Sequence, residues 1–308
     1  MSRRFSTTRR PVDGVLLLDK PTGITSNAAL QRVKHLLCAM KAGHSGTLDP
    51  LASGLLPLCF GEATKFSSNA FLADKVYLAE IMLGMTTTTG DAEGEIVTRL
   101  PVNVSLPKIK ETLQRFVGTI SQTPPRYSAV KHRGKPLYAY ARAGEEVTVE
   151  PRMIIIYDLQ LLDYHMDRLH LRVHCGSGTY VRALAEDIGR ELGCGAMLAA
   201  LRRIIVGGFD IASAVSFNAI ETIAADQVIN LLMPVDSLVT ALPMCLLEPT
   251  EVQQIITGRI CRINAGKPGR VRLYDSERRF LGVGEVLAEG TVAPRRLLSG
   301  ALSVASGR

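Results

Sequence analysis

The sequence lacks the cysteine and histidine patterns that hold metal ions or cross-link small secreted domains. Its six cysteines are scattered without a CxxC pair, and no histidine stands at zinc-finger spacing from them. Neither a metal site nor a disulfide framework is therefore indicated. Scattered thiols fit a reducing compartment, so we expect a cytoplasmic protein that binds no metal.

Long hydrophobic runs are also missing. The longest early run, GVLLL from Gly14, is followed directly by the charged residues Asp19 and Lys20. A run of this length is too short for a membrane span or for the core of a signal peptide. We therefore expect no association with a membrane.

Acidic residues are scarce at both ends of the chain. Of the net charge of +7, residues 1–10 contribute +4 and residues 249–308 contribute +5. The opening segment has the composition of a transit peptide, but it is short, which favours a loose basic arm. A near-neutral body with basic ends is typical of a polyanion-binding protein whose body carries out chemistry. A solvated basic surface without a partner is the alternative.

The 308 residues, with 46% hydrophobic content, are enough for a folded globular protein, and the hydrophobic periodicity predicts both helices and strands. An amphipathic helix is expected after Thr25 or Ser26, and a second over residues 181–192, ended by Gly193. Strands are expected from Gly14 and over residues 75–83.

A hairpin is expected to turn near Met166 and Asp167, because alternating apolar residues lie on both sides of this point. The alternation places His170 and His174 on a solvent-facing side of the second strand rather than around a metal ion.

The final part of the chain changes texture at about Thr250, where short strands and turn residues predict a small β-barrel. We therefore divide the chain into residues 1–248 and residues 249–308. Within the first part, residues 123–152 combine basic residues with tyrosines, a combination that grips phosphates and stacks on bases. A solvated loop is the alternative for this segment.

A single carboxylate, Asp49, stands in the Gly-rich stretch KAGHSGTLDPLASGLLPLCF, which turns apolar directly after it. Asp49 with Pro50 could cap a short helix. An ionised, oriented carboxylate is also a nucleophile, and the two interpretations are compatible.

Six motifs together resemble those of the tRNA pseudouridine(55) synthases, a bacterial family of RNA-modifying enzymes. They are LLLDKPTGITS, AGHSGTLDPLASGLLPLCFGEATKF, DKVYLAEIMLGMTTTTGDAEGEI, TPPRYSAVKHRGKPLYAYARAGEEV, GSGTYVRALAEDIG and AMLAALRR. The resemblance implies an α+β fold, with a mixed, largely antiparallel sheet flanked by helices, followed by a small β-barrel of the PUA type. It implies isomerisation of uridine 55 in the T-loop of tRNA to pseudouridine, without a cofactor.

The resemblance also assigns roles to three residues that would do chemistry. Asp49 would be the nucleophile, and Arg182 would pair with it, since a guanidinium can hold a carboxylate through two parallel hydrogen bonds. Tyr77 would stack on the flipped base and take part in the proton steps at C5. Without this context, Tyr77 would be a buried aromatic residue and Arg182 a surface residue.

Four further residues would shape the substrate site. Tyr180 and Leu201 would line the uridine pocket, His44 would pack against the RNA where the nucleotide leaves its loop, and Lys20 would buttress the cleft. Taken alone, Leu201 would be a helix core residue and His44 a solvated loop residue.

Two rival functions remain on the sequence. The dyskerin group performs the same chemistry inside a guide-RNA particle, but residues 123–152 resemble the insertion of the stand-alone enzymes, so we expect a monomer that needs no guide RNA. A non-catalytic RNA chaperone is the other rival, and it would not require Asp49, Tyr77 and Arg182 together.

Overall fold

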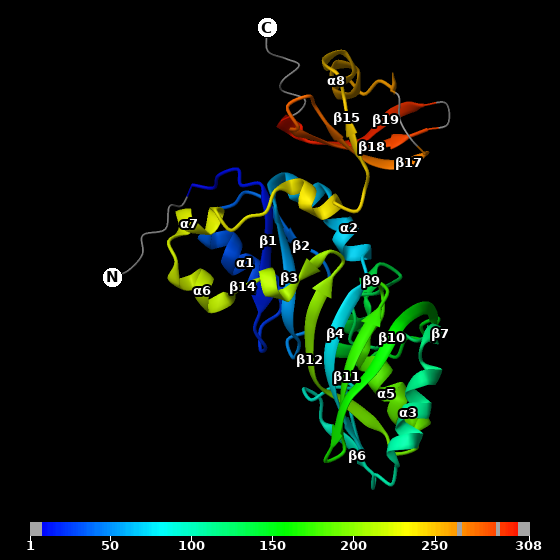
Figure 1. Ribbon diagram of the computed structural model, residues 1–308. Coiled ribbons are helices and arrows are strands. Elements are labelled where there is room, and N and C mark those ends of the chain that lie inside the picture. The colour runs from blue at the N-terminus through cyan, green and yellow to red at the C-terminus, as the bar shows by residue number, and fades with distance from the viewer. Residues whose placement is uncertain (1–7, 264–266, 288–289, 301–308) are drawn as a thin grey trace.

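The computed structural model describes residues 8–263, 267–287 and 290–300 (Figure 1). Its main sheet has ten strands in the order β14-β1-β3-β12-β4-β11-β10-β7, with β13 beside β12 and β2 beside β3. The strands are β1 (Gly14–Lys20), β2 (Ala42–His44), β3 (Ser53–Phe60), β4 (Lys75–Leu83), β7 (Gly118–Gln122), β10 (Arg152–His165), β11 (Arg168–Cys175), β12 (Ala196–Val206), β13 (Phe209–Asp210) and β14 (Val215–Ser216). Only the β1–β14 and β3–β12 pairs are parallel. The expected mixed, largely antiparallel sheet is confirmed.

Helices lie on both faces of this sheet, except α8, which packs against the strands of the C-terminal part. The described helices are α1 (Ser26–Leu36), α2 (Ser67–Leu72), α3 (Leu106–Arg115), α4 (Leu137–Arg142), α5 (Val181–Glu191), α6 (Phe217–Thr222), α7 (Ala225–Ile229) and α8 (Pro249–Ile256), with 3-10 turns η1 (Gly61–Lys65), η2 (Ile211–Ser213) and η3 (Val235–Val239). The cap predicted for α1 is confirmed, because the Thr25 hydroxyl accepts from the Ala28 amide at 3.0 Å. Gly193 follows α5 with a φ of 78°, as a C-terminal glycine should.

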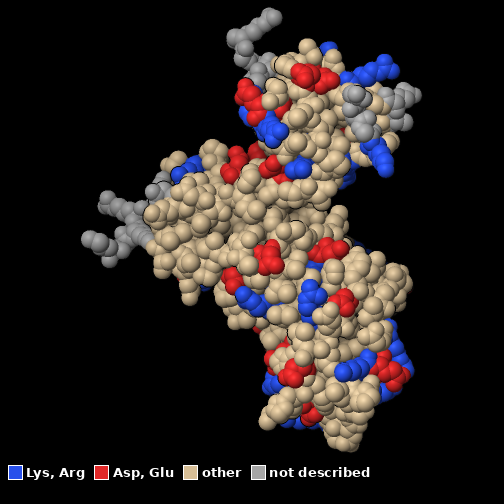
Figure 2. All heavy atoms as spheres, viewed as in Figure 1, with Lys and Arg blue, Asp and Glu red and all other residues tan. Residues whose placement is uncertain are grey.

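The two faces of the sheet are covered unequally. Buried residues of α1, α3, α5 and α6 form one core cluster with alternate residues of the sheet, such as Leu16, Ala79 and Ile81. On the opposite face, η1, α2 and η3 pack over β1, β3, the end of β12 and β13. The rest of that face is open, and Figure 2 shows acidic and basic side chains interspersed on this side of the molecule.

The predicted hairpin is confirmed as β10 and β11, and its turn residues Met166 and Asp167 have φ of 46° and 61°. His170 and His174 alternate with the buried residues of β11 and are half-buried. No group of His, Cys, Asp and Glu that could hold a metal ion is found among the described residues. Likewise, none of the helices described is long and apolar enough to cross a membrane.

The prediction of a short helix that begins at Asp49 is wrong. The Ala52 amide donates to the Asp49 carbonyl at 3.1 Å, which makes a tight turn, and strand β3 starts at Ser53. Gly54 has a φ of 102°, which a helix does not accept. The apolar run after the turn is therefore a buried strand paired with β1 along its whole length.

A second sheet forms the C-terminal part, in the order β15-β17-β18-β19-β16. Its strands are β15 (Met244–Leu246), β16 (Cys261–Arg262), β17 (Gly269–Tyr274), β18 (Phe280–Val286) and β19 (Thr291–Leu297). Strand β15 precedes residue 249, so this sheet begins before the expected division of the chain. It touches the body where the rings of Phe66 and Phe280 lie 5.6 Å apart and where Lys65 donates to the Leu297 carbonyl at 3.0 Å.

Two short two-stranded sheets complete the fold: β5 (Met85–Thr87) with β6 (Ile96–Arg99), and β8 (Lys131–His132) with β9 (Lys135–Pro136). Most of the expected N-terminal basic arm lies outside the described residues. Arg10, which lies inside them, donates from Nε to the Leu37 carbonyl at 3.2 Å.

Candidate active site

A cavity of about 540 Å³ opens beside the turn that carries Asp49. Five of the seven site residues expected from the sequence line it: Asp49, Tyr77, Tyr180, Arg182 and Leu201. They come from the Asp49 turn, β4, the N-terminus of α5 and β12, which are far apart in the chain. Lys20 and His44 lie nearby but do not line the cavity.

The Asp49 turn is fastened to the body through its backbone. The buried hydroxyl of Ser26, in α1, donates to the Leu48 carbonyl at 2.9 Å and accepts from the Leu48 amide at 2.8 Å. The Gly23 amide donates to the Pro50 carbonyl at 2.8 Å. These bonds leave the Asp49 side chain little freedom except to face the cavity.

The Asp49 carboxylate combines access with an apolar environment. Half of its side-chain surface, 50%, remains accessible, yet it sits in the cavity with protein on most sides. Burial is the main cause that raises its pKa, Arg182 opposes this, and Asp91 adds to it. An accessible carboxylate whose charge is only partly balanced, by Arg182, can act as a nucleophile.

Arg182 pairs with Asp49, as expected, but not through two parallel hydrogen bonds. Its Nη2 donates to Asp49 Oδ2 at 3.2 Å and to the Tyr127 carbonyl at 2.8 Å. Its Nη1 donates instead to Asp91 Oδ2 at 2.9 Å and to the Thr89 carbonyl at 3.2 Å. The guanidinium, 7% exposed, is thus oriented by the protein before it meets Asp49.

Asp91 is one of the site residues that sequence reasoning missed. It is 2% exposed, and its Oδ1 accepts from the Thr89 hydroxyl at 2.5 Å and from the Glu93 amide at 3.1 Å. Its place inside the motif MTTTTGDAEGEI was the available signal. A buried acid held by three donors keeps Arg182 in place when Asp49 changes its protonation state.

The pocket-lining residues Leu201 and Tyr77 lie in strands, and Tyr180 lies at the start of a helix. Leu201 lies in strand β12, so the helix considered for it is wrong. Tyr77 lies in β4 and is 8% exposed. Tyr180 caps α5, and its backbone exchanges two hydrogen bonds with the Gln122 side chain, at 2.8 and 3.1 Å.

Lys20 and His44 lie behind the cavity wall. The Lys20 ammonium donates to the carbonyls of Pro21 and Ile24 at 2.7 and 2.8 Å, and burial lowers its pKa to about 8, with Asp49 opposing this. His44 lies in β2, where burial and then the charge of Arg203 lower its pKa. Its Nδ1 is buried without a hydrogen-bond partner among the described residues.

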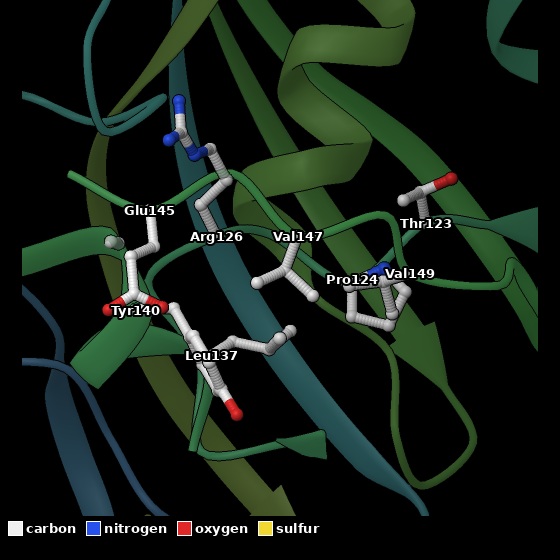
Figure 3. Close-up of a pocket in the computed structure, with 9 residues that line it drawn as sticks. Thr123, Pro124, Arg126, Leu137, Tyr140, Glu145, Val147 and Val149 are labelled. Atoms are coloured by element: carbon white, nitrogen blue, oxygen red, sulfur yellow. The ribbon is translucent and has the colours of Figure 1, made fainter. Parts of the chain in front are cut away.

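Residues 123–152 form a small unit of their own, with β8, β9 and α4. Pro124, Leu137, Val147 and Val149 gather around a cavity of about 90 Å³ (Figure 3). Basic groups lie over aromatic rings on this unit, Arg142 over Tyr138 at 5.6 Å and Lys135 over Tyr140 at 5.9 Å.

Comparison with known proteins places the chain in a family. Residues 34–181 match the N-terminal domain of the TruB family pseudouridylate synthases. Residues 182–240 match the tRNA pseudouridylate synthase B C-terminal domain, and residues 243–298 the C-terminal domain of pseudouridine synthase II TruB. The tRNA pseudouridine synthase B of Azoarcus sp. (strain BH72) is 53% identical over 94% of this chain and 96% of its own length.

The chain belongs to the TruB family of pseudouridylate synthases. The tRNA pseudouridine synthase B of Aromatoleum aromaticum is 51% identical over 97% of this chain and 96% of the relative. As a TruB family member, the protein is a pseudouridine synthase and therefore an isomerase.

Solved structures agree with the pseudouridine synthase fold of the TruB family. A crystal structure of a Cbf5-Nop10-Gar1 complex is similar with a TM-score of 0.67 and 26% identity, over 90% of this chain and 79% of that chain. An H/ACA RNP bound to a substrate RNA containing 2′-deoxyuridine matches with a TM-score of 0.71 over 96% of this chain and 91% of that chain. At 22% identity, the second match shows the fold alone.

Proposed function

We propose that this protein isomerises uridine 55 in the T-loop of tRNA to pseudouridine, acting in the cytoplasm as a monomer without a cofactor or a guide RNA. The observation that carries the proposal is the Asp49–Arg182–Asp91 array at a cavity that Tyr77 also lines. Its support in the comparisons is the identity of about half of the residues to enzymes named tRNA pseudouridine synthase B.

The reaction needs a nucleophile that can be released again. The bond between uracil N1 and the ribose breaks, the base turns in the site, C5 bonds to the same ribose carbon, and the hydrogen of C5 is lost while N1 gains one. Asp49 would hold the electrophilic intermediate covalently, and a weakly basic carboxylate can afterwards leave. Water must stay out of the site, because hydrolysis would release the base.

The other residues would orient the substrate. Tyr77 would stack on the flipped uracil and serve the proton steps at C5, and Tyr180 and Leu201 would enclose the base. Arg182 would fix the direction of the Asp49 carboxylate. His44 would contact the RNA at the point where the nucleotide leaves its loop, and Lys20 would support the cleft from behind.

Two parts of the chain would grip the tRNA. The basic and aromatic side chains of residues 123–152 suit contact with phosphates and bases. The second sheet, which starts with β15, would be an RNA-binding domain of the PUA type, and its basic residues would contact phosphates.

Tritium release from a tRNA transcript labelled at uridine C5 tests this function. Isomerisation expels that hydrogen, so we expect one tritium per tRNA, and none from a transcript in which cytidine replaces uridine 55. Binding of the transcript without release would leave only an RNA-binding function.

A further inference from the structure

Arg203 is a fully buried cation in β12, with 1% of its surface exposed. Its Nε donates to the Leu55 carbonyl at 2.8 Å, and its Nη2 donates to the Gly46 carbonyl at 3.0 Å. The guanidinium thereby joins β3 and β12 to the loop that leads to Asp49. Both carbonyls are neutral, so neither compensates the charge of Arg203.

Arg203 and Tyr77 lie directly opposite each other where β12 pairs with β4. Cross-strand neighbours point to the same face of a sheet, and both side chains line the cavity. The charge of Arg203 acts on the Tyr77 phenol from this position. The arginine is thus the cation directly across the sheet from the hydroxyl at which Tyr77 could exchange a proton.

We propose that Arg203 is a positioning residue for the reaction, which holds a fixed positive charge across from the Tyr77 side chain at the cavity and thereby assists loss of the proton from its hydroxyl. This inference rests on the proposed function. It adds a residue outside the Asp49–Arg182–Asp91 array and assigns it to the proton step rather than to the nucleophile.

The charged and titratable groups around Tyr77 act in opposite directions. Burial is the main cause that raises the pKa of the Tyr77 phenol, and Cys175 of β11 and the Asp49 carboxylate raise it further. The charge of Arg203 lowers it. Arg203 is therefore the group that counteracts the apolar environment of this phenol.

Other basic side chains near Arg203 lose their positive charge in basic solution and so cannot take over its role. Burial, with a contribution from Arg203, lowers the pKa of Lys20 in β1 and of Lys75 in β4 to about 8. His44 of β2 also has a lowered pKa, for the same two reasons. An arginine keeps its proton throughout this range, so its charge persists where a phenol ionises.

The step assigned to Tyr77 is the removal of the C5 proton after C5 has bonded to the ribose. The C5–H bond breaks and its electron pair forms the C5–C6 double bond, while the pair of the C6–N1 double bond moves to N1, which takes up a proton. The phenolate oxygen takes the proton from C5 and becomes a phenol. Because the surroundings as a whole raise the pKa of this phenol, the phenolate is its minor form, and the charge of Arg203 increases the share of that form.

The pH dependence of the single-turnover rate of tritium release tests the inference in Arg203→Gln, Arg203→Lys and the control Arg202→Gln. Arg202 is the neighbouring arginine, points to the opposite face and pairs with Asp19 at 2.7 Å. We expect the rate of Arg203→Gln to fall on the order of tenfold or more at neutral pH. The rising limb of its pH–rate profile, where the rate increases with pH, should move to higher pH by at least about one unit. Arg203→Lys should lie between Arg203→Gln and the unchanged protein, and Arg202→Gln should match the latter.

An equal loss of rate at every pH in folded Arg203→Gln would overturn the inference, because a purely structural role would not move the limb. If Arg203→Gln does not fold, a ring-fluorinated tyrosine at position 77, whose phenol is more acidic, decides the matter. It must move the rising limb to lower pH, and an unmoved limb would overturn the inference. Failure of the unchanged protein to release tritium at any pH would instead refute the proposed function.

Discussion

At the scale of single residues, the site depends on groups that come from distant parts of the chain. Asp49 and Arg182 could be predicted from motifs, because each stands in a local sequence that resembles a known family. Asp91 contacts Arg182, which is 91 positions away in the sequence, and Arg203 contacts Gly46, which is 157 positions away. Both residues stand inside the motifs, but their local sequence does not encode these distant partners, so neither was given a role.

Asp49 should reduce the stability of the fold at neutral pH. Its folded-state pKa is raised, so the folded protein binds this proton more tightly than the unfolded chain does, and stability is lost as pH rises from 3.8 through the raised value. We expect Asp49→Asn to melt higher by on the order of one or two degrees at pH 7. The difference should shrink as the pH falls toward 3.8. A lower melting temperature at pH 7 would mean that the contact with Arg182 outweighs burial.

Asp91→Asn should slow catalysis without a comparable loss of tRNA binding. It removes the charge that holds Nη1 of Arg182, so the guanidinium no longer fixes the direction of Asp49. We expect the single-turnover rate at saturating tRNA to fall on the order of a hundredfold. The control is Asp187→Asn, which removes an acid of the same helix as Arg182 that pairs with exposed Arg190 at 2.7 Å. A rate for Asp91→Asn equal to that of the control would contradict the role of Asp91.

At the scale of elements, local signals predicted α1, α5 and the β10–β11 hairpin, since caps, periodicity and turn residues lie within a few positions of each element. The turn at Asp49 could not be predicted in this way. Gly54 has a φ of 102°, which favours glycine, and the Arg203 backbone of β12 passes close to it. A Cβ at this position would lie 2.2 Å from the Arg203 carbonyl oxygen. The elements that form the site are therefore decided by tertiary packing.

Gly54→Ala should be far more destabilising than a glycine substitution in an open loop. The control is Gly23→Ala, where φ is 82° but no atom lies within 4 Å of the added Cβ. We expect Gly23→Ala to lower the free energy of unfolding by about 1–2 kcal/mol, from backbone strain alone. Gly54→Ala should exceed about 3 kcal/mol in urea unfolding, because a clash with backbone is added to the strain. Equal costs at both positions would show that β12 can move away from β3.

At the scale of the whole molecule, the second sheet is attached to the body at a distance from the cavity. The contacts run from η1 and the start of α2 to β18 and β19, through Phe66, Phe280 and the Lys65–Leu297 hydrogen bond. The sequence placed the division at residue 248, after β15, because the strand Met244–Leu246 is too short to be recognised without its partner β17.

Removal of the second sheet, by ending the chain after Ala241, should weaken tRNA binding and spare the chemistry. Each phosphate contact that is lost should reduce the slope of log affinity against log salt by about 0.7–0.9. The single-turnover rate at saturating tRNA should change much less. Because the cut uncovers Phe66, circular dichroism must first show that the shortened protein is folded. A collapse of the rate in a folded protein would contradict this division of roles.

The most direct measurement for the site as a whole is single-turnover tritium release by Asp49→Asn, with its identity confirmed by mass spectrometry, from a tRNA transcript labelled at uridine C5. Asparagine has nearly the same shape and cannot serve as the nucleophile. We expect no release while the tRNA affinity stays within about tenfold, or about 1.4 kcal/mol, of the unchanged protein. Substantial release by the purified variant would show that Asp49 is not the nucleophile.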